Sequence, residues 1–102
     1  MNDVSLQLNS EGRGSFFIDK EGERLAEMVV RVDEKNMTVF HTEVSEKLRG
    51  QGVAGQLLSS MVAYAREHQL KVTPLCSYVA AQFKQHPEQY ADILNKDWHS
   101  KT

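Results

Sequence analysis

The sequence predicts one α+β domain: a mostly antiparallel, twisted sheet of about five strands, with one central crossover helix and short C-terminal helices. Three observations carry this prediction. The first half alternates apolar and polar residues between short polar turns, a helical period begins abruptly at Val53, and a β-branched segment follows that helix. We place the single domain at residues 1–102, a length that removes about two-thirds of the unfolded surface from water.

Four strands are predicted in the first half of the chain. "VSLQL" alternates with period two and precedes the turn sequence "NSEGRG". The next candidates are "SFFID", "RLAEMVVRV" and "MTVFHTEV", separated by the polar turns "KEGE" and "DEKN". Such short connections favour hairpins, and therefore antiparallel pairing, over crossover helices.

The second half opens with the crossover helix. Its apolar stripe runs from Val53 to the polar "REHQ" and consists of Leu57, Leu58, Met61, Val62 and Ala65. We expect "LKVTPLCSY" to form the fifth strand and "VAAQFKQ" a short helix. "HPEQYADILNK" reads as another helix, with His86 at its cap and Pro87 in its first turn.

Composition narrows the class of function. The net charge of −2 gives no electrostatic case for nucleic acid or an anionic membrane. Cys76 is the only cysteine, which excludes an internal disulfide and fits a reducing compartment. Neither a leader nor a long apolar run is visible, so we expect a cytoplasmic protein that is a monomer or weak dimer. We expect no metal site.

The stretch "RGQGVAG", residues 49–55, admits two interpretations. Gly50, Gly52 and Gly55 match the G-x-G-x-x-G turn of dinucleotide-binding folds, whereas Arg49, Gly52 and Ala54 match an R-x-x-G-x-A pattern that binds the diphosphate of coenzyme A. The dinucleotide fold places its turn after the first strand of a parallel series. Here the motif follows four hairpin-connected strands, which favours the coenzyme A interpretation.

The segment "HTEVSEKLRGQGVAGQLLSSMVAYARE" resembles the central motif of the GNAT superfamily of acyl-CoA N-acyltransferases, and "HTEV…RGQG…PLC…HPE" resembles a small stand-alone branch of it. The resemblance covers roughly residues 37 to 94. It implies that the chain binds acetyl-CoA and transfers the acetyl group to an amine acceptor. The acceptor itself, a small molecule or a protein, does not follow from the sequence.

The motif has a physical rationale as an anion site. Glycines let successive backbone N–H groups approach a ligand closely, and the helix that follows adds the positive end of its dipole. Arg49 can add a charge-assisted contact. The resemblance also implies a polarising backbone N–H near Val44. The predicted cofactor-binding residues are Val44, Arg49, Gly50, Gln51, Gly52, Val53, Ala54 and Gly55.

Four residues are candidates for catalysis. His41 and Glu43 lie two apart on one strand, so both side chains project from one face of the sheet as a proton-handling pair. Cys76 can take the acetyl group as a thiolate or be a small buried hydrophobe. Tyr78 can protonate the leaving sulfur, as tyrosine does in this superfamily, or pack as a rim aromatic.

One departure from the family bears on the acceptor. Larger members carry helices between the first two strands, which form one wall of the acceptor site, whereas "NSEGRG" is only a tight turn. We therefore expect an open acceptor side. A non-catalytic acyl-CoA-binding module, or an adaptor that has lost its acceptor site, is the alternative to an enzyme.

Overall fold

A computed structural model describes residues 3–98, so residues 1–2 and 99–102 of the predicted domain lie outside the described residues. Its elements, in chain order, are β1 (Ser5–Leu8), β2 (Arg13–Lys20), β3 (Glu23–Val32), β4 (Asn36–Val44), the 3₁₀ turn η1 (Glu46–Leu48), α1 (Val53–Glu67), β5 (Lys71–Pro74), α2 (Ser77–Gln85) and α3 (Pro87–Tyr90).

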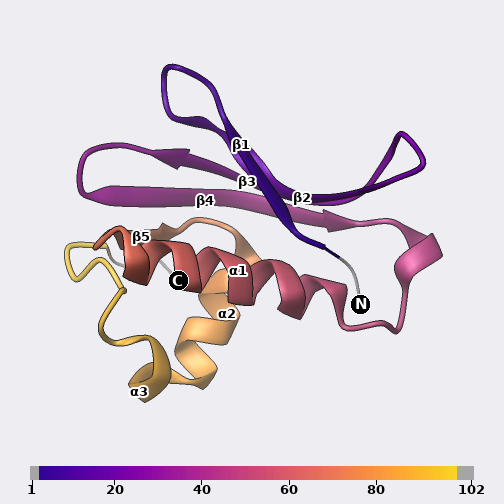
Figure 1. Ribbon diagram of the computed structural model, residues 1–102. Helices are drawn as coiled ribbons and strands as arrows, with labels where there is room; N and C mark the ends of the chain where they lie inside the picture. Colours follow the sequence, from indigo (N-terminus) through magenta and orange to yellow (C-terminus); the bar gives the residue numbers. More distant parts are fainter. Residues whose placement is uncertain (1–2, 99–102) are drawn as a thin grey trace.

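The five strands form one sheet in the order β1-β2-β3-β4-β5. The first four pair antiparallel and β5 joins β4 in parallel through the α1 crossover. Figure 1 shows the helices gathered on one side of this twisted sheet, with α1 running along it. The predicted α+β fold is therefore confirmed.

The core lies between the sheet and the helices. Apolar side chains from one face of the strands meet the stripe of α1, whose six predicted apolar residues are all buried. The alternating residues on the other face of β2 and β3 are mostly exposed or half-buried. The fully buried side chains on the sheet side include Ile18, Met28, Val30, Met37, Val39, Val72 and Pro74.

Tight turns leave the second face of the sheet without a helix. Between β1 and β2, the Asn9 side chain accepts hydrogen bonds from the N–H groups of Glu11 and Arg13. Between β2 and β3, Glu21 and Gly22 both have positive φ, 51° and 80°, as a two-residue hairpin turn requires. The expected helix-free connection between the first two strands is thus present.

Two β-bulges interrupt the strict alternation of the strands. In β4 the pairing shifts between Val39 and His41, which leaves Phe40 as the extra residue. In β3 it shifts between Arg24 and Ala26, which leaves Leu25 as the extra residue. Each bulge moves the residues beyond it to the opposite face of the sheet, a change that an alternating pattern does not predict.

The predicted fifth strand, 70–78, was too long. β5 ends at Pro74, because proline has no N–H to continue the ladder. Cys76 is the N-cap residue of α2, and Ser77 and Tyr78 are already helical.

The last predicted helix, 86–96, was also too long. α3 ends at Tyr90, and Leu94 then forms a parallel bridge with Val72 along the free edge of β5. The Asn95 amide donates to the Asn36 side chain (2.8 Å), which ties this segment to the sheet. His86 stands at the N-cap of α3, but its side chain makes no capping hydrogen bond.

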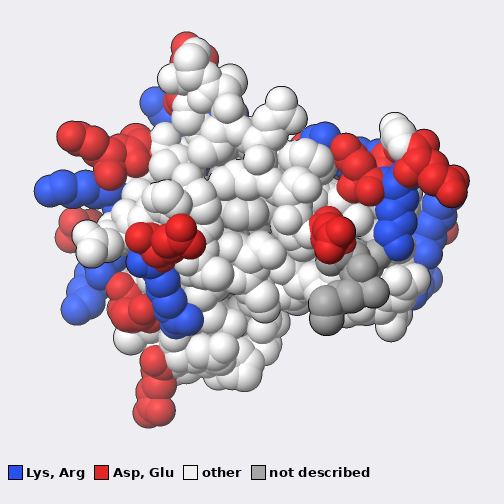
Figure 2. Space-filling view, viewed as in Figure 1, with Lys and Arg blue, Asp and Glu red and all other residues white. Residues whose placement is uncertain are grey.

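Charged side chains of both signs gather at the two ends of the face shown in Figure 2, with an uncharged area between them. This distribution agrees with the small net charge of −2. Across residues 3–98, no helix combines the length and the apolar character needed to span a membrane.

We expect Leu57→Ala to lower the free energy of unfolding by about 2–5 kcal/mol, because Leu57 is fully buried under the sheet and its truncation leaves a cavity. Ser59→Ala is the matched control on the exposed side of the same helix and should change it by less than about 0.5 kcal/mol. Urea unfolding measures both. Equal effects of the two substitutions would contradict the proposed packing of α1.

Candidate active site

The connection from β4 to α1 is fixed at both of its ends. The Ser45 hydroxyl accepts a hydrogen bond from the Lys47 N–H (3.2 Å) and so caps η1, and the Ser45 N–H donates to the Leu25 carbonyl (2.7 Å). Leu48 is buried and anchors the turn to the core. The following residues, 49–52, are exposed and lead directly into α1.

Two glycines give this connection its shape. Gly50 has φ 80°, and Gly52, the N-cap residue of α1, has φ 68°; both lie in the left-handed region that favours glycine. A Cβ built at either position, or at Gly55 in the first turn of α1, meets no atom within 4 Å. Space for a ligand therefore lies directly over the glycine backbone.

The N-terminus of α1 presents donors toward this space. The first backbone N–H of α1 that has an acceptor is that of Gln56, which donates to the carbonyl of the N-cap residue Gly52 (3.2 Å). Within residues 3–98, the N–H groups of Val53, Ala54 and Gly55 have no acceptor. Free N–H groups at the positive end of a helix dipole constitute an anion-binding arrangement.

A cleft of about 520 Å³ lies over these donors. Its volume is in the range of small-molecule sites. All the predicted cofactor-binding residues line this cleft except Gln51, which is exposed. The Gln51 carbonyl accepts a hydrogen bond from Gln56 Nε2 (3.4 Å). The residues that line it are Val44, Ser45, Glu46, Leu48, Arg49, Gly50, Gly52, Val53, Ala54, Gly55 and Tyr78. The sequence prediction missed Ser45, Glu46 and Leu48, although they directly precede the motif.

Arg49 places an exposed positive charge in the lining of the cleft. Its guanidinium lies 3.3 Å from Glu46, and both side chains are largely exposed. Exposed pairs of this kind contribute little to stability. The guanidinium is therefore able to exchange its partner for an anionic ligand in the cleft.

Tyr78, in the first turn of α2, adds a phenol to the lining of the cleft. Burial, with smaller effects of Tyr90 and Cys76, raises its pKa above the ordinary value. The Tyr78 hydroxyl is therefore protonated across the neutral pH range. It lines the cleft.

His41 and Glu43 project from the same face of the sheet, as their two-residue spacing predicted. His41 Nε2 lies 3.9 Å from Glu43 Oε1, and the Glu43 side chain is 79% exposed. Their register partners on β3 are Val29 and Glu27. The pair thus lies on the helix-free face, outside the 520 Å³ cleft.

Cys76 lies where β4 and β5 part. The two strands pair only as far as Val39, whose carbonyl accepts the Cys76 N–H (2.9 Å). The side chain is 4% exposed, and its Sγ lies 3.3 Å from the Thr42 hydroxyl on the helix side of β4. The thiol therefore does not line the cleft, and the structure separates it from His41 and Glu43 by the thickness of the sheet.

Comparison with known proteins identifies the family. A model of the family described as GCN5-related N-acetyl-transferase matches residues 15–93. The chain therefore belongs to this family, the GNAT N-acetyltransferases. It is also 33% identical to a GCN5-like protein from Staphylococcus aureus of known solution structure; the alignment covers 93% of this chain and 91% of that one, with a TM-score of 0.66.

More distant structures share the fold. A ribosomal-protein-alanine N-acetyltransferase from Brucella melitensis is 15% identical over 100% of this chain and 98% of that chain, with a TM-score of 0.66. A GNAT acetyltransferase from Elizabethkingia anophelis is 18% identical over 76% of this chain and 53% of that chain, with a TM-score of 0.54. That protein has acetyl-CoA bound, which agrees with the cofactor predicted from the sequence.

Proposed function

We propose that this chain binds acetyl-CoA in the cleft between β4 and α1 and transfers the acetyl group to a primary amine. The observation that carries the proposal is the convergence of the motif residues Arg49–Gly55 on one cleft with free backbone donors. The family is one of N-acetyltransferases. When bound, acetyl-CoA supplies the acetyl group as a reactive thioester.

The residues present fit this cofactor. The N–H groups of Val53, Ala54 and Gly55 suit a diphosphate, and the open space over Gly50 and Gly52 lets its oxygens approach the backbone. Arg49 adds a charge-assisted contact once it leaves Glu46. Val44, at the other side of the cleft, offers backbone groups to the thioester end.

Glu43 is the proposed general base. Amine acetylation requires the attacking nitrogen to lose a proton, and a carboxylate beside the cofactor cleft accepts it. Glu43 directly precedes Val44, which lines the cleft, and its side chain is exposed on the helix-free face. His41, 3.9 Å away, is the partner through which the proton passes to solvent.

Tyr78 is the proposed general acid. Its raised pKa keeps the hydroxyl protonated, and it lines the same cleft as Val44. A proton donated there neutralises the thiolate that leaves when the acetyl group is transferred. Glu43 thus accepts a proton on the helix-free face of the sheet, and Tyr78 donates a proton within the cleft.

A second candidate route runs through Cys76, whose thiol lies at the end of the β4–β5 pairing beside Thr42. In this route the Cys76 thiol would take the acetyl group and its proton would pass to the departing coenzyme A sulfur. The amine then attacks the new thioester and the Cys76 thiolate leaves. Because Cys76 is 4% exposed, this route requires local opening between β4 and α2.

Gly52→Ala tests the cofactor cleft. We expect the added methyl to occupy the space of a phosphate oxygen and to weaken acetyl-CoA binding by about tenfold or more, as measured by calorimetry. Gly22→Ala is the matched control, because Gly22 also has positive φ (80°) and open surroundings but lies in the β2–β3 turn. Equal affinities of the two variants would place the cofactor elsewhere.

Glu43→Gln tests the general base. With an amine that the unchanged protein acetylates, kcat should fall by about 10²–10⁴, while the affinity for acetyl-CoA stays the same. Glu34→Gln, in the exposed β3–β4 turn, makes the same change of charge and should retain full activity. If kcat of Glu43→Gln remains within a few-fold, His41 becomes the candidate base.

Incubation with acetyl-CoA alone separates the remaining alternatives. The Cys76 route predicts a protein mass increased by one acetyl group, located on the peptide that contains Cys76 and absent in Cys76→Ala. Turnover of an amine without this adduct supports direct transfer. Binding of acetyl-CoA with neither thiol release nor adduct formation, across a panel of amines, would identify a non-catalytic module.

A further inference from the structure

Gln56, in the first turn of α1, carries a buried oxygen without a hydrogen-bond partner. Its Nε2 donates to the Gln51 carbonyl (3.4 Å), but its Oε1 accepts from no donor. Within residues 3–98 it is the one buried side-chain oxygen or nitrogen left in this state. Buried polar groups are nearly always paired, because an unpaired one loses its hydrogen bonds to water and gains none in return.

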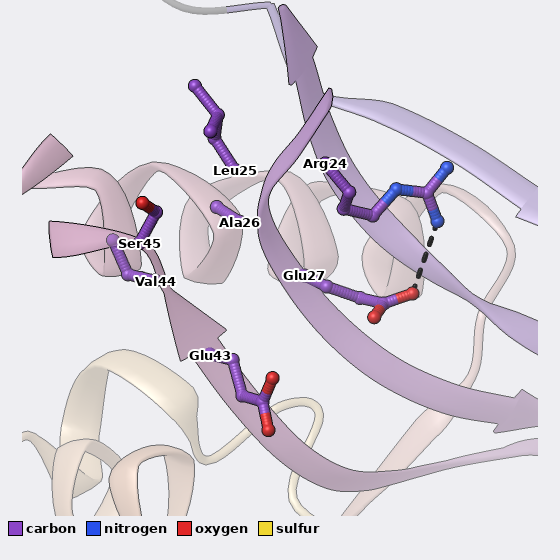
Figure 3. Close-up of a pocket in the computed structure, with 7 residues that line it drawn as sticks. All are labelled: Arg24, Leu25, Ala26, Glu27, Glu43, Val44 and Ser45. Atoms are coloured by element: carbon purple, nitrogen blue, oxygen red, sulfur yellow. Dashed lines mark hydrogen bonds and ion pairs between the residues drawn. The ribbon is translucent and has the colours of Figure 1, made fainter. Parts of the chain in front are cut away.

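Other polar side chains in partly buried places do have partners. The buried Ser15 hydroxyl donates to Glu27 (2.8 Å), and Arg24 donates to the same carboxylate oxygen (3.2 Å). Arg24 and Glu27 both line a second cavity of about 370 Å³, where Figure 3 shows them turned toward each other. The exception at Gln56 is therefore specific to the start of α1.

The amide of Gln56 has one acceptable orientation. If its nitrogen and oxygen exchanged places, Oε1 would face the Gln51 carbonyl, and two acceptors would repel each other. The side chain is thus oriented by the Gln51 carbonyl, although this orientation leaves Oε1 unpaired. A contact that is kept at such a cost adds little to the stability of the fold.

The hydrogen bond from Gln56 sets the direction of the peptide unit between Gln51 and Gly52. In a planar trans peptide the C=O and the N–H point in opposite directions. Gln51 and Gln56 both lie outside the lining of the cofactor cleft, whereas Gly52 belongs to it. The carbonyl therefore points away from the cleft, and the Gly52 N–H points toward it.

This peptide unit would otherwise turn over easily. Gly52 has φ 68°, and glycine adopts positive and negative φ about equally well. Within the described part of the chain, the Gly52 N–H has no acceptor that would hold it in place. A reversed peptide would aim its carbonyl oxygen, instead of a donor, at an anion in the cleft.

On the basis of the proposed function, we propose that Gln56 is a positioning residue of the cofactor cleft. Its Nε2 holds the Gln51 carbonyl, so that the Gly52 N–H joins the three free N–H groups of α1 as a fourth donor to a diphosphate group. Gln56 acts through this peptide and does not line the cleft itself. Its contribution is to ligand binding and not to stability.

Gln56→Met tests the proposal, because it removes the Nε2 donor and the unpaired oxygen together at similar side-chain length. We expect calorimetry to give an acetyl-CoA Kd raised about fivefold or more, while the melting temperature stays the same or rises. A purely structural role of Gln56 predicts a lower melting temperature instead. Gln82→Met is the matched control, half-buried on α2 outside the cleft lining, and should leave the affinity unchanged.

NMR of the full ¹⁵N-labelled chain tests the Gly52 N–H directly, with CoA and with inorganic pyrophosphate as separate probes. Both should move the amide proton of Gly52 downfield in the unchanged protein. In Gln56→Met the shift of Gly52 should be largely lost, while those of residues 53–55 remain. Equal Gly52 shifts in the two proteins overturn the proposal. Gln56→Ala keeps a strong helix former and is the second variant if Gln56→Met does not fold.

The two proposals fail with different signatures. Acetyl-CoA that binds at residues 50–55 with equal affinity in Gln56→Met refutes the role of Gln56 and leaves the proposed function standing. Pyrophosphate binding that depends on Gln56, without any binding of acetyl-CoA, refutes the proposed function and leaves the role of Gln56 standing. If neither probe shifts residues 50–55, both proposals are wrong.

Discussion

The extra residue in β4, Phe40, decides which side chains reach which face of the sheet. Met37 and Val39 before it face the helices, and so does Thr42 after it, whose register partner Met28 is fully buried. Without the bulge, strict alternation from Val39 would turn His41 and Glu43 into the core. An unpaired charge is strongly unfavourable there. The bulge separates a helix-side thiol at Cys76 from an open-face carboxylate at Glu43.

Much of the fold could be predicted from the sequence because its signals are local. The alternation of β2 and β3, the apolar stripe of α1 and the glycines at 50 and 52 each depend on residues within a few positions of one another. The place of the proposed cofactor cleft could be predicted from the same local signals, since a glycine-rich turn before a helix builds an anion site from backbone groups.

The rest depends on contacts between distant segments. The bulges at Leu25 and Phe40 are set by the register between strands, which no single segment encodes. For the same reason the sequence did not point to Glu27, whose position follows from Ser15 on another strand. The early end of α3 reflects the hydrogen bond of Asn95 to Asn36, far away in the chain.

Val44 and Ser45 line both the proposed cofactor cleft and a second cavity of about 370 Å³, formed by residues 24–27 and 43–45. The two spaces are formed by different kinds of groups. The cofactor cleft uses backbone N–H groups and glycines, so many sequences can preserve it. The second cavity uses side chains held by other side chains, and a single substitution can change its charge. A substitution in the second cavity can therefore leave the backbone donors of the cleft between β4 and α1 unchanged, except at the two residues that both spaces share.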